Sequence, residues 1–250
     1  MDFLTGSVSF CGSPKLPIVG RAIFSGVGRT RLNGALLVFS RYPRLGEVKT
    51  RLSPILSPAA CLELHQALLL DTLDRIAPFE VARHLFLADC SELEIREFAR
   101  AHRLPEGLHL HIQEGKDLGD RMWNAYREVS PSWDRIVFLG SDSPSLPLSR
   151  IAESLVQLEH FPVVAGPVED GGYYLLALAE PRKELFYGIQ WGTSVVLEQT
   201  LSKLGVGECL LLAPWYDVDT ESDLHRLEKD LGGEFEGFPR RTFDFLRQKA

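Results

Sequence analysis

The chain has 250 residues, 45% of them hydrophobic and 24% charged, which is enough for one large core or two small ones. Its 27 Lys and Arg against 34 Asp and Glu give a net charge of −7, which argues against a nucleic-acid partner because a phosphate backbone requires a broad cationic face. No run of about 18 apolar residues predicts a transmembrane helix. The four cysteines lack the spacing of a zinc site or a disulfide framework, which favours a reducing cytoplasm.

The first 33 residues are basic and rich in Gly and Ser. Their positive charges follow a short apolar stretch, whereas a signal peptide places its charges before one. We interpret residues 1–33 as an N-terminal extension in the form of a flexible arm. A transit peptide is the alternative interpretation.

From Gly34 onward, short apolar runs alternate with segments of helical period. The run at 35–40 predicts a strand buried on both faces, and Ser57-Pro58 predicts the start of a helix, with Ser as N-cap. Further strands are expected at 84–88, 108–113, 135–139 and 162–165, separated by helices at 91–102, 118–129 and 148–160. This alternation predicts an α/β fold whose largely parallel sheet is covered on both faces.

The alternation fails once, at Glu169-Asp170-Gly171-Gly172, where two apolar runs are joined without room for a helix. A reversed strand is therefore expected near Gly172–Leu178. A helix at 193–204, a strand at 209–212 and a helix at 220–231 follow, the last with Thr220 and Asp223 placed as a capping box. The remaining segment, 232–250, is a basic, aromatic C-terminal tail without clear periodicity, so 34–231 is expected to form the domain.

Ligands of open α/β sheets bind beyond the carboxyl ends of the strands. After the first predicted strand, the loop 41–51 carries four cations against the single acid Glu47: Arg41, Arg44, Lys49 and Arg51. Lys acts as a point charge and Arg as a fork toward phosphate oxygens, so this basic loop predicts a phosphate site. The loop lacks the Walker consensus, and a solvated basic loop is the alternative.

Acidic residues follow two other predicted strands. Asp142 comes directly after the strand at 135–139, where it is well placed to bind a divalent cation that also contacts phosphates. The alternative is an Asp that caps a Ser-Pro turn. Asp217 and Asp219 follow the last strand and would supply a second ligand. A calcium loop is excluded there because Ser222 replaces the required Gly.

The remaining candidates carry weaker signals. Asp170-Gly171 is typical of a hairpin turn, although Glu169 and Asp170 would also bring acids to the same cleft. Tyr173, Tyr174 and Trp191 would stack on a base or a sugar if they are not part of the core. His109 and His111 have metal-like spacing, but with no third ligand nearby they are interpreted as a surface pair.

Five motifs occur in order and resemble one family. They are Tyr42–Leu52 (YPRLGEVKTRL), Asp117–Met122 (DLGDRM), Gly140–Pro144 (GSDSP), Gly166–Leu175 (GPVEDGGYYL) and Asp217–Thr220 with Asp223-Leu224. Together they resemble the cofactor-guanylyltransferase-like branch of the GT-A superfamily, called DUF2064 or the radical-SAM/selenodomain-associated transferases. The resemblance extends from about Ala35 to Leu231. The family usually has Trp-Ser-Thr where this chain has Trp191-Gly192-Thr193, so one hydroxyl of the pattern is missing.

The resemblance implies a GT-A, Rossmann-like three-layer sandwich of the nucleotide-diphospho-sugar transferase type. It implies Asp142 and Asp219 as ligands of Mg²⁺ or Mn²⁺. Catalytic roles fall on Lys49, Glu169 and Asp170, the last facing the acceptor. Nucleotide contacts are expected from Gly46, Lys49, Arg51, Arg121, Ser141 and Asp142, and substrate contacts from Gly171, Gly172, Tyr173, Trp191 and Thr193.

The leading hypothesis is a metal-dependent transferase that moves a sugar from a nucleoside-diphosphate sugar to a small acceptor. The alternative is nucleotidyl transfer, in which an acceptor attacks the α-phosphate of a nucleoside triphosphate and pyrophosphate leaves. Both reactions need cations around phosphates and a carboxylate-bound metal, so residue types do not separate them. A non-catalytic nucleotide-binding subunit is the second alternative.

Overall fold

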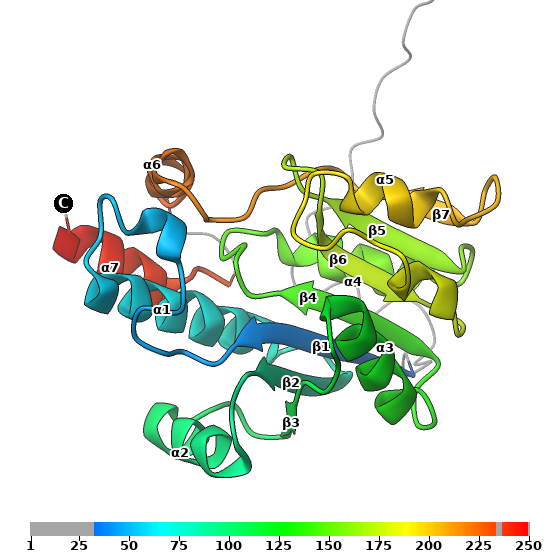
Figure 1. Cartoon of the computed structure of the whole chain (residues 1–250), viewed down its shortest axis with the longest axis horizontal. Coiled ribbons are helices and arrows are strands. Elements are labelled where there is room, and N and C mark those ends of the chain that lie inside the picture. Colours follow the sequence, from blue (N-terminus) through cyan, green and yellow to red (C-terminus); the bar gives the residue numbers. More distant parts are fainter. Residues whose placement is uncertain (1–32, 234–236, 250) are drawn as a thin grey trace, which may run out of the picture. The chain divides into compact units, whose positions relative to one another are not determined.

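The computed structural model describes residues 33–233 and 237–249, so the predicted extension at 1–33 lies outside the described residues apart from Asn33. The described chain forms a seven-stranded sheet in the order β3-β2-β1-β4-β6-β5-β7 (Figure 1). The strands are β1 (Gly34–Arg41), β2 (Ala82–Ala88), β3 (Leu108–Ile112), β4 (Arg135–Gly140), β5 (Val163–Pro167), β6 (Tyr173–Leu178) and β7 (Cys209–Leu211). Strand β6 is antiparallel to β4 and β5, and the other pairs are parallel, which confirms the predicted α/β fold with one reversed strand.

The described residues form seven helices, four of which have a side-chain N-cap. They are α1 (Pro58–Ile76), α2 (Glu92–His102), α3 (Leu118–Val129), α4 (Leu148–Gln157), α5 (Val196–Leu201), α6 (Glu221–Asp230) and α7 (Arg240–Lys249), with 3-10 turns η1 (Thr50–Leu52) and η2 (Lys183–Phe186). Ser57 caps α1 by accepting a hydrogen bond from the Ala60 N–H at 3.2 Å. The predicted capping box of Thr220 and Asp223 is present at the start of α6.

Alternate residues of the strands build two apolar layers. Leu36 and Val38 of β1 pack with apolar side chains of α1, α2 and α4 on one face of the sheet. Ala35 and Leu37 pack with α3 and η2 on the other face. Side chains of successive strand residues point to opposite faces, so a strand covered on both sides is apolar where it is covered, as residues 35–39 of β1 are.

The C-terminal tail differs from its prediction, since residues 240–249 form helix α7 beside α1 (Figure 1). Phe245 and Leu246 are buried in the cluster that also contains Leu64 and Leu68 of α1. The buried Asp71 of α1 accepts hydrogen bonds from the backbone N–H of Arg241 and Thr242. Tertiary packing and these hydrogen bonds stabilise a helix that the pattern of apolar residues in the tail did not predict.

The predicted helix at 193–204 is shorter in the structure, where α5 begins only at Val196. The Thr193 hydroxyl donates to the Gln190 carbonyl at 2.7 Å, which holds the preceding residues in a turn. Among the described helices, none is long and apolar enough to cross a membrane.

Candidate functional site

The basic loop after β1 turns back onto the sheet through two residues with left-handed backbone. Gly46 has φ 79°, and Lys49, a residue that rarely adopts this region, has φ 49° directly before η1. The sharp turn directs the Lys49 side chain inward, where it is only 4% exposed. A non-Gly residue held in this conformation is a feature that occurs preferentially at functional sites.

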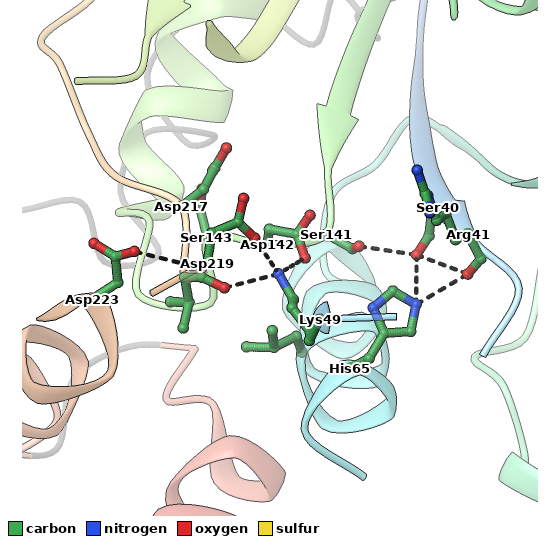
Figure 2. Close-up of polar contacts among 12 residues, drawn as sticks. Ser40, Arg41, Lys49, His65, Ser141, Asp142, Ser143, Asp217, Asp219 and Asp223 are labelled. Atoms are coloured by element: carbon green, nitrogen blue, oxygen red, sulfur yellow. Dashed lines mark hydrogen bonds and ion pairs between the residues drawn. The ribbon is translucent and has the colours of Figure 1, made fainter. Parts of the chain in front are cut away.

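The Lys49 ammonium lies between two of the predicted site carboxylates (Figure 2). Its Nζ is 2.5 Å from Asp142 Oδ1 and 3.0 Å from Asp219 Oδ1, and it donates to the Val218 carbonyl at 2.8 Å. Burial alone would lower the pKa of Lys49, but the two carboxylates outweigh it and raise that pKa. In turn, Lys49 outweighs the effect of burial on Asp142 and lowers the pKa of that carboxyl.

A third carboxylate, Asp217, joins this cluster. The Ser143 hydroxyl donates to Asp217 Oδ1 at 2.5 Å, and the Val218 N–H donates to the Asp142 carbonyl at 2.9 Å, which ties the two acidic loops together. Burial and the negative charge of Asp142 raise the pKa of Asp217 to about 7. The site therefore carries more negative charge than Lys49 balances. We call Lys49, Asp142, Asp217 and Asp219 the acidic cluster.

The acidic cluster suits a divalent cation by its donor set. Carboxylate and hydroxyl oxygens are ligands that Mg²⁺ accepts, and the acidic cluster presents three carboxylates beside the one buried ammonium of Lys49. Lys49 lies between two of the carboxylates. In residues 33–233 and 237–249, no three His, Cys, Asp or Glu side chains are arranged as metal ligands. A bound cation and Lys49 would therefore have to share the carboxylate oxygens of Asp142 and Asp219.

The three arginines of the basic loop point to different partners. Arg44 turns to α2, where its guanidinium is 2.5 Å from Glu94 Oε1. Arg51 is 68% exposed on its side chain, with Nη1 3.5 Å from Asp219 Oδ2. Arg41 is exposed and donates to the Glu47 carbonyl at 3.4 Å. Arg41 and Arg51 thus remain open to solvent beside the acidic cluster.

Two predicted nucleotide contacts are held by other groups. Ser141 is 1% exposed, and its hydroxyl donates to the Ser40 hydroxyl at 3.0 Å. Arg121, at the start of α3, lies 3.2 Å from Asp89 and donates to the Gly115 carbonyl at 3.3 Å. Arg121 thus holds the ends of β2 and β3, and Ser141 holds the ends of β1 and β4.

The hairpin between β5 and β6 contains the predicted acceptor-facing acids. Asp170 is exposed, and its Oδ1 accepts the Gly172 N–H at 3.1 Å, which closes the turn. Glu169 pairs with Arg226 of α6 at 2.7 Å. Gly171 has φ 91°, and a Cβ there would lie 1.9 Å from the Ser194 carbonyl oxygen, so this turn requires glycine.

The predicted aromatic contacts lie under the hairpin. Tyr173 and Trp191 meet edge to face with ring centroids 6.5 Å apart, and the Tyr173 hydroxyl contacts Met122 Sδ at 3.7 Å. Trp191 also packs against Gly119 of α3, where a Cβ would lie 2.8 Å from the indole nitrogen. These aromatics join β6, α3 and the segment before α5.

The structure adds residues that the sequence reasoning missed. Helix α1 holds the loop after β4 through Arg75, which donates to the Pro144 and Leu146 carbonyls, and Thr72, which donates to the Ser141 carbonyl at 3.5 Å. His65 of the same helix lies 3.1 Å from the Arg41 carbonyl. In the sequence, each of these residues is a polar side chain among the apolar residues of a predicted helix, and this pattern could have indicated a buried polar contact.

The histidine pair at 109 and 111 gains a third histidine. His84 of β2 stacks on His109 and lies with Nδ1 2.9 Å from His111 Nε2, while His111 Nδ1 is 2.7 Å from Glu128. Burial and the other two histidines lower the pKa of His84 to about 4. His111 and Glu128 also line a cavity of about 720 Å³ between α2 and α3. Within residues 33–233 and 237–249, these histidines are not part of any group of three potential metal ligands.

The comparisons with known proteins agree with the motifs. Residues 72–193 match the family model of uncharacterized proteins conserved in bacteria, DUF2064, which confirms the resemblance. The chain is 29% identical over 148 residues to 2-phospho-L-lactate guanylyltransferase from Methanothermobacter thermautotrophicus (strain Delta H). That match covers 58% of this chain and spans 62% of the relative's length.

Two solved structures show the fold. A protein from Desulfovibrio desulfuricans G20, provisionally assigned as a nucleotide-diphospho-sugar transferase, has a TM-score of 0.77 and 29% identity, covering 87% of this chain and 98% of its own. The 4-diphosphocytidyl-2C-methyl-D-erythritol synthase from Anaerococcus prevotii has a TM-score of 0.50 and 11% identity over 76% of this chain and 92% of its own. The fold is therefore of the nucleotide-diphospho-sugar transferase type, and the relatives are transferases.

Proposed function

We propose that this protein, whose residues 72–193 match the DUF2064 family model, is a metal-dependent transferase that uses an activated nucleotide. The observation that carries the proposal is the acidic cluster, in which three carboxylates and Lys49 meet at the carboxyl edge of the sheet. Parallel α/β sheets bind ligands at this edge. Two of the acids contact the buried ammonium of Lys49 and the third lies beside them, a set of oxygens that a cation bound to phosphates would use.

The proposed division of roles follows the contacts. Asp142 and Asp219, with Asp217 beside them, would hold Mg²⁺ or Mn²⁺, which supplies Lewis-acid stabilisation of charge on the departing phosphates. Lys49 offsets the negative charge of the carboxylates and of the phosphates together. Arg51 and Arg41, open to solvent on the same loop, bind the outer phosphate oxygens.

Acceptor binding is assigned to the hairpin after β5. Asp170 is exposed there, and the hydrogen bond from the Gly172 N–H to Oδ1 fixes its direction while leaving Oδ2 for an acceptor hydroxyl. A carboxylate in that position orients or deprotonates the acceptor. Glu169, paired with Arg226, contributes at the rim.

Two reactions remain candidates, and the similarity to a guanylyltransferase supports nucleotidyl transfer. Transfer of a sugar from a nucleoside-diphosphate sugar is the second candidate, supported by the provisional name of the Desulfovibrio protein. Both use the same cation-lined phosphate site and differ in the bond that breaks, between the α- and β-phosphates or between sugar and diphosphate.

The test is a panel of nucleoside triphosphates and nucleotide sugars, with and without Mg²⁺, read first by thermal shift because a bound ligand raises apparent stability. Ligands that stabilise the protein are then incubated with small phosphorylated and hydroxyl acceptors. Release of pyrophosphate identifies nucleotidyl transfer, and release of nucleoside diphosphate identifies glycosyl transfer. Stabilisation by a nucleotide without turnover would favour a binding subunit, and no stabilisation by any nucleotide would contradict the proposal.

A further inference from the structure

The backbone ladder between β1 and β4 stops just before the acidic cluster. Its last register pair is Phe39 and Gly140, and the next residues, Ser40 and Ser141, are joined instead through their side chains. The Ser141 hydroxyl donates to the Ser40 hydroxyl at 3.0 Å, and both residues are buried. Beyond this contact the two strands diverge. β1 continues into the basic loop that carries Lys49, and β4 continues into the loop that begins with Ser141 and Asp142.

His65 of α1 completes the contact from below (Figure 2). Its Nε2 is 3.1 Å from the Arg41 carbonyl oxygen and 3.4 Å from the Ser40 hydroxyl. A carbonyl oxygen accepts only, so the geometry assigns the hydrogen to Nε2. Burial lowers the pKa of His65, which favours the neutral ring with this single tautomer.

The hydrogen bonds form one directed chain. Ser141 donates to the Ser40 hydroxyl, which itself donates to the Arg41 carbonyl at 3.2 Å. The single Nε2–H of His65 donates to the same carbonyl, and the Ser40 hydroxyl lies 3.4 Å from that nitrogen. Gln113 donates to the Ser40 carbonyl at 3.1 Å from the side of β2 and β3. The carboxyl end of β1 is thereby held from three directions, and a buried chain of this kind is rigid when each member has its partner.

Because Arg41 opens the loop that carries Lys49, and Ser141 precedes Asp142, this chain joins the two backbones that end in the 2.5 Å ion pair of the acidic cluster. An apolar side chain at position 65 would fill the same space but would leave the Arg41 carbonyl without this donor.

We propose that His65 is a positioning residue which, through Ser40 and the Arg41 carbonyl, sets Lys49 against Asp142 for binding of a metal–nucleotide complex. The inference rests on the proposed function for its ligand but adds His65 and Ser40, which the proposed site does not include. His65 itself touches neither metal nor nucleotide in this account.

The test compares His65→Leu with His65→Gln, whose amide N–H reaches about the position of Nε2. Leu69→Ala, a fully buried apolar change one helical turn after His65 in α1, is the control for loss of stability alone. Titration with Mn²⁺ and GTP is expected to give about tenfold weaker binding for His65→Leu, the loss of about one buried hydrogen bond. His65→Gln and Leu69→Ala are expected to stay within about threefold of the unchanged protein.

A second readout needs no nucleotide. Lys49 is 4% exposed, so an amine-acylating reagent followed by peptide mass spectrometry should label it slowly in the unchanged protein, His65→Gln and Leu69→Ala, and faster in His65→Leu. Equal labelling of Lys49 in all four proteins would overturn the inference, as would equal weakening of binding by His65→Gln and His65→Leu. If labelling follows the expected order while the unchanged protein binds none of the nucleoside triphosphates and nucleotide sugars of the panel, the proposed function falls and the positioning of Lys49 by His65 stands.

Discussion

Two parts of the carboxyl edge carry the predicted acids, and they differ in what holds those acids in place. In the acidic cluster, Asp142 and Asp219 face the same ammonium from separate loops, at 2.5 and 3.0 Å, and no turn or cap depends on the Asp142 side chain. In the hairpin after β5, Glu169 pairs with a helix and Asp170 closes a turn. The acidic cluster is therefore the side that we propose for metal and phosphate, whereas the hairpin is first of all a structural element that presents one exposed carboxylate.

The largest expected effect is that of Lys49→Met. Loss of the ammonium leaves three neighbouring carboxylates and the phosphates without their buried cation, so turnover should fall about 10²- to 10³-fold. Arg44→Met is the matched control, since Arg44 lies on the same loop but pairs with Glu94 of α2. Initial rates of the two variants under saturating nucleotide separate the roles, and equal losses in both would remove the distinction between the acidic cluster and the rest of the loop.

Asp170→Asn tests the hairpin as chemistry. The amide oxygen can still accept the Gly172 N–H, so the melting temperature should stay within about 2 °C, while turnover should fall at least about tenfold through loss of the carboxylate toward the acceptor. Affinity for Mn²⁺ and nucleotide should not change. Full activity in this variant would leave the hairpin with a structural role alone.

Gly171→Ala tests the same hairpin as structure. The positive φ and the approach of a Cβ to the Ser194 carbonyl should destabilise the protein by about 2–4 kcal/mol. Gly172→Ala is the neighbouring control, because a Cβ there meets its nearest atom, Asp170 Oδ1, at 3.4 Å and φ is not in the left-handed region. Urea unfolding of both variants measures the difference, and similar values would show that the turn yields to a side chain.

The smallest expected effect is a pH dependence from Asp217. Its pKa is about 7 in the folded chain, against an ordinary value of 3.8, because of burial and of Asp142. The folded state therefore keeps a proton that the unfolded state has lost, and the stability that this proton contributes is present below about pH 4 and is lost as pH rises through about 7. In EDTA, the stability of Asp217→Asn relative to the unchanged protein should increase between about pH 5 and 8. A difference that stays constant over this range would show that Asp217 is ionised throughout.

The sequence was sufficient for the fold and for part of the site. Apolar runs alternating with helical periods predict the sheet, and the single break at residues 169–172 predicts the reversed strand β6. Lys49, Asp142 and Asp219 could be proposed because each follows a strand, and parallel strands end at one edge. Their gathering around one ammonium in the structure agrees with that reasoning, while their functional roles stay predictions.

The remaining features depend on contacts between residues far apart in the chain. His65 meets Ser40 across 25 residues and Ser40 meets Ser141 across 101, so no local pattern announces them. Arg226 neutralises Glu169 across 57 residues, which removes much of the charge that the hairpin shows in the sequence. Helix α7 likewise depends on Asp71, 171 residues before Thr242. These features depend on contacts between distant residues, which the spacing of residues along the chain does not predict.

Asp142→Asn is the sharpest test of whether the acidic cluster binds a metal–nucleotide complex. Mn²⁺ binding is measured calorimetrically with and without nucleotide for this variant and for the unchanged protein. Asp142→Asn keeps the side chain's shape but removes one of the charges around Lys49, so metal-dependent nucleotide binding should be abolished while the fold, read by circular dichroism, is retained. Unchanged affinity in Asp142→Asn would contradict the assignment of the site.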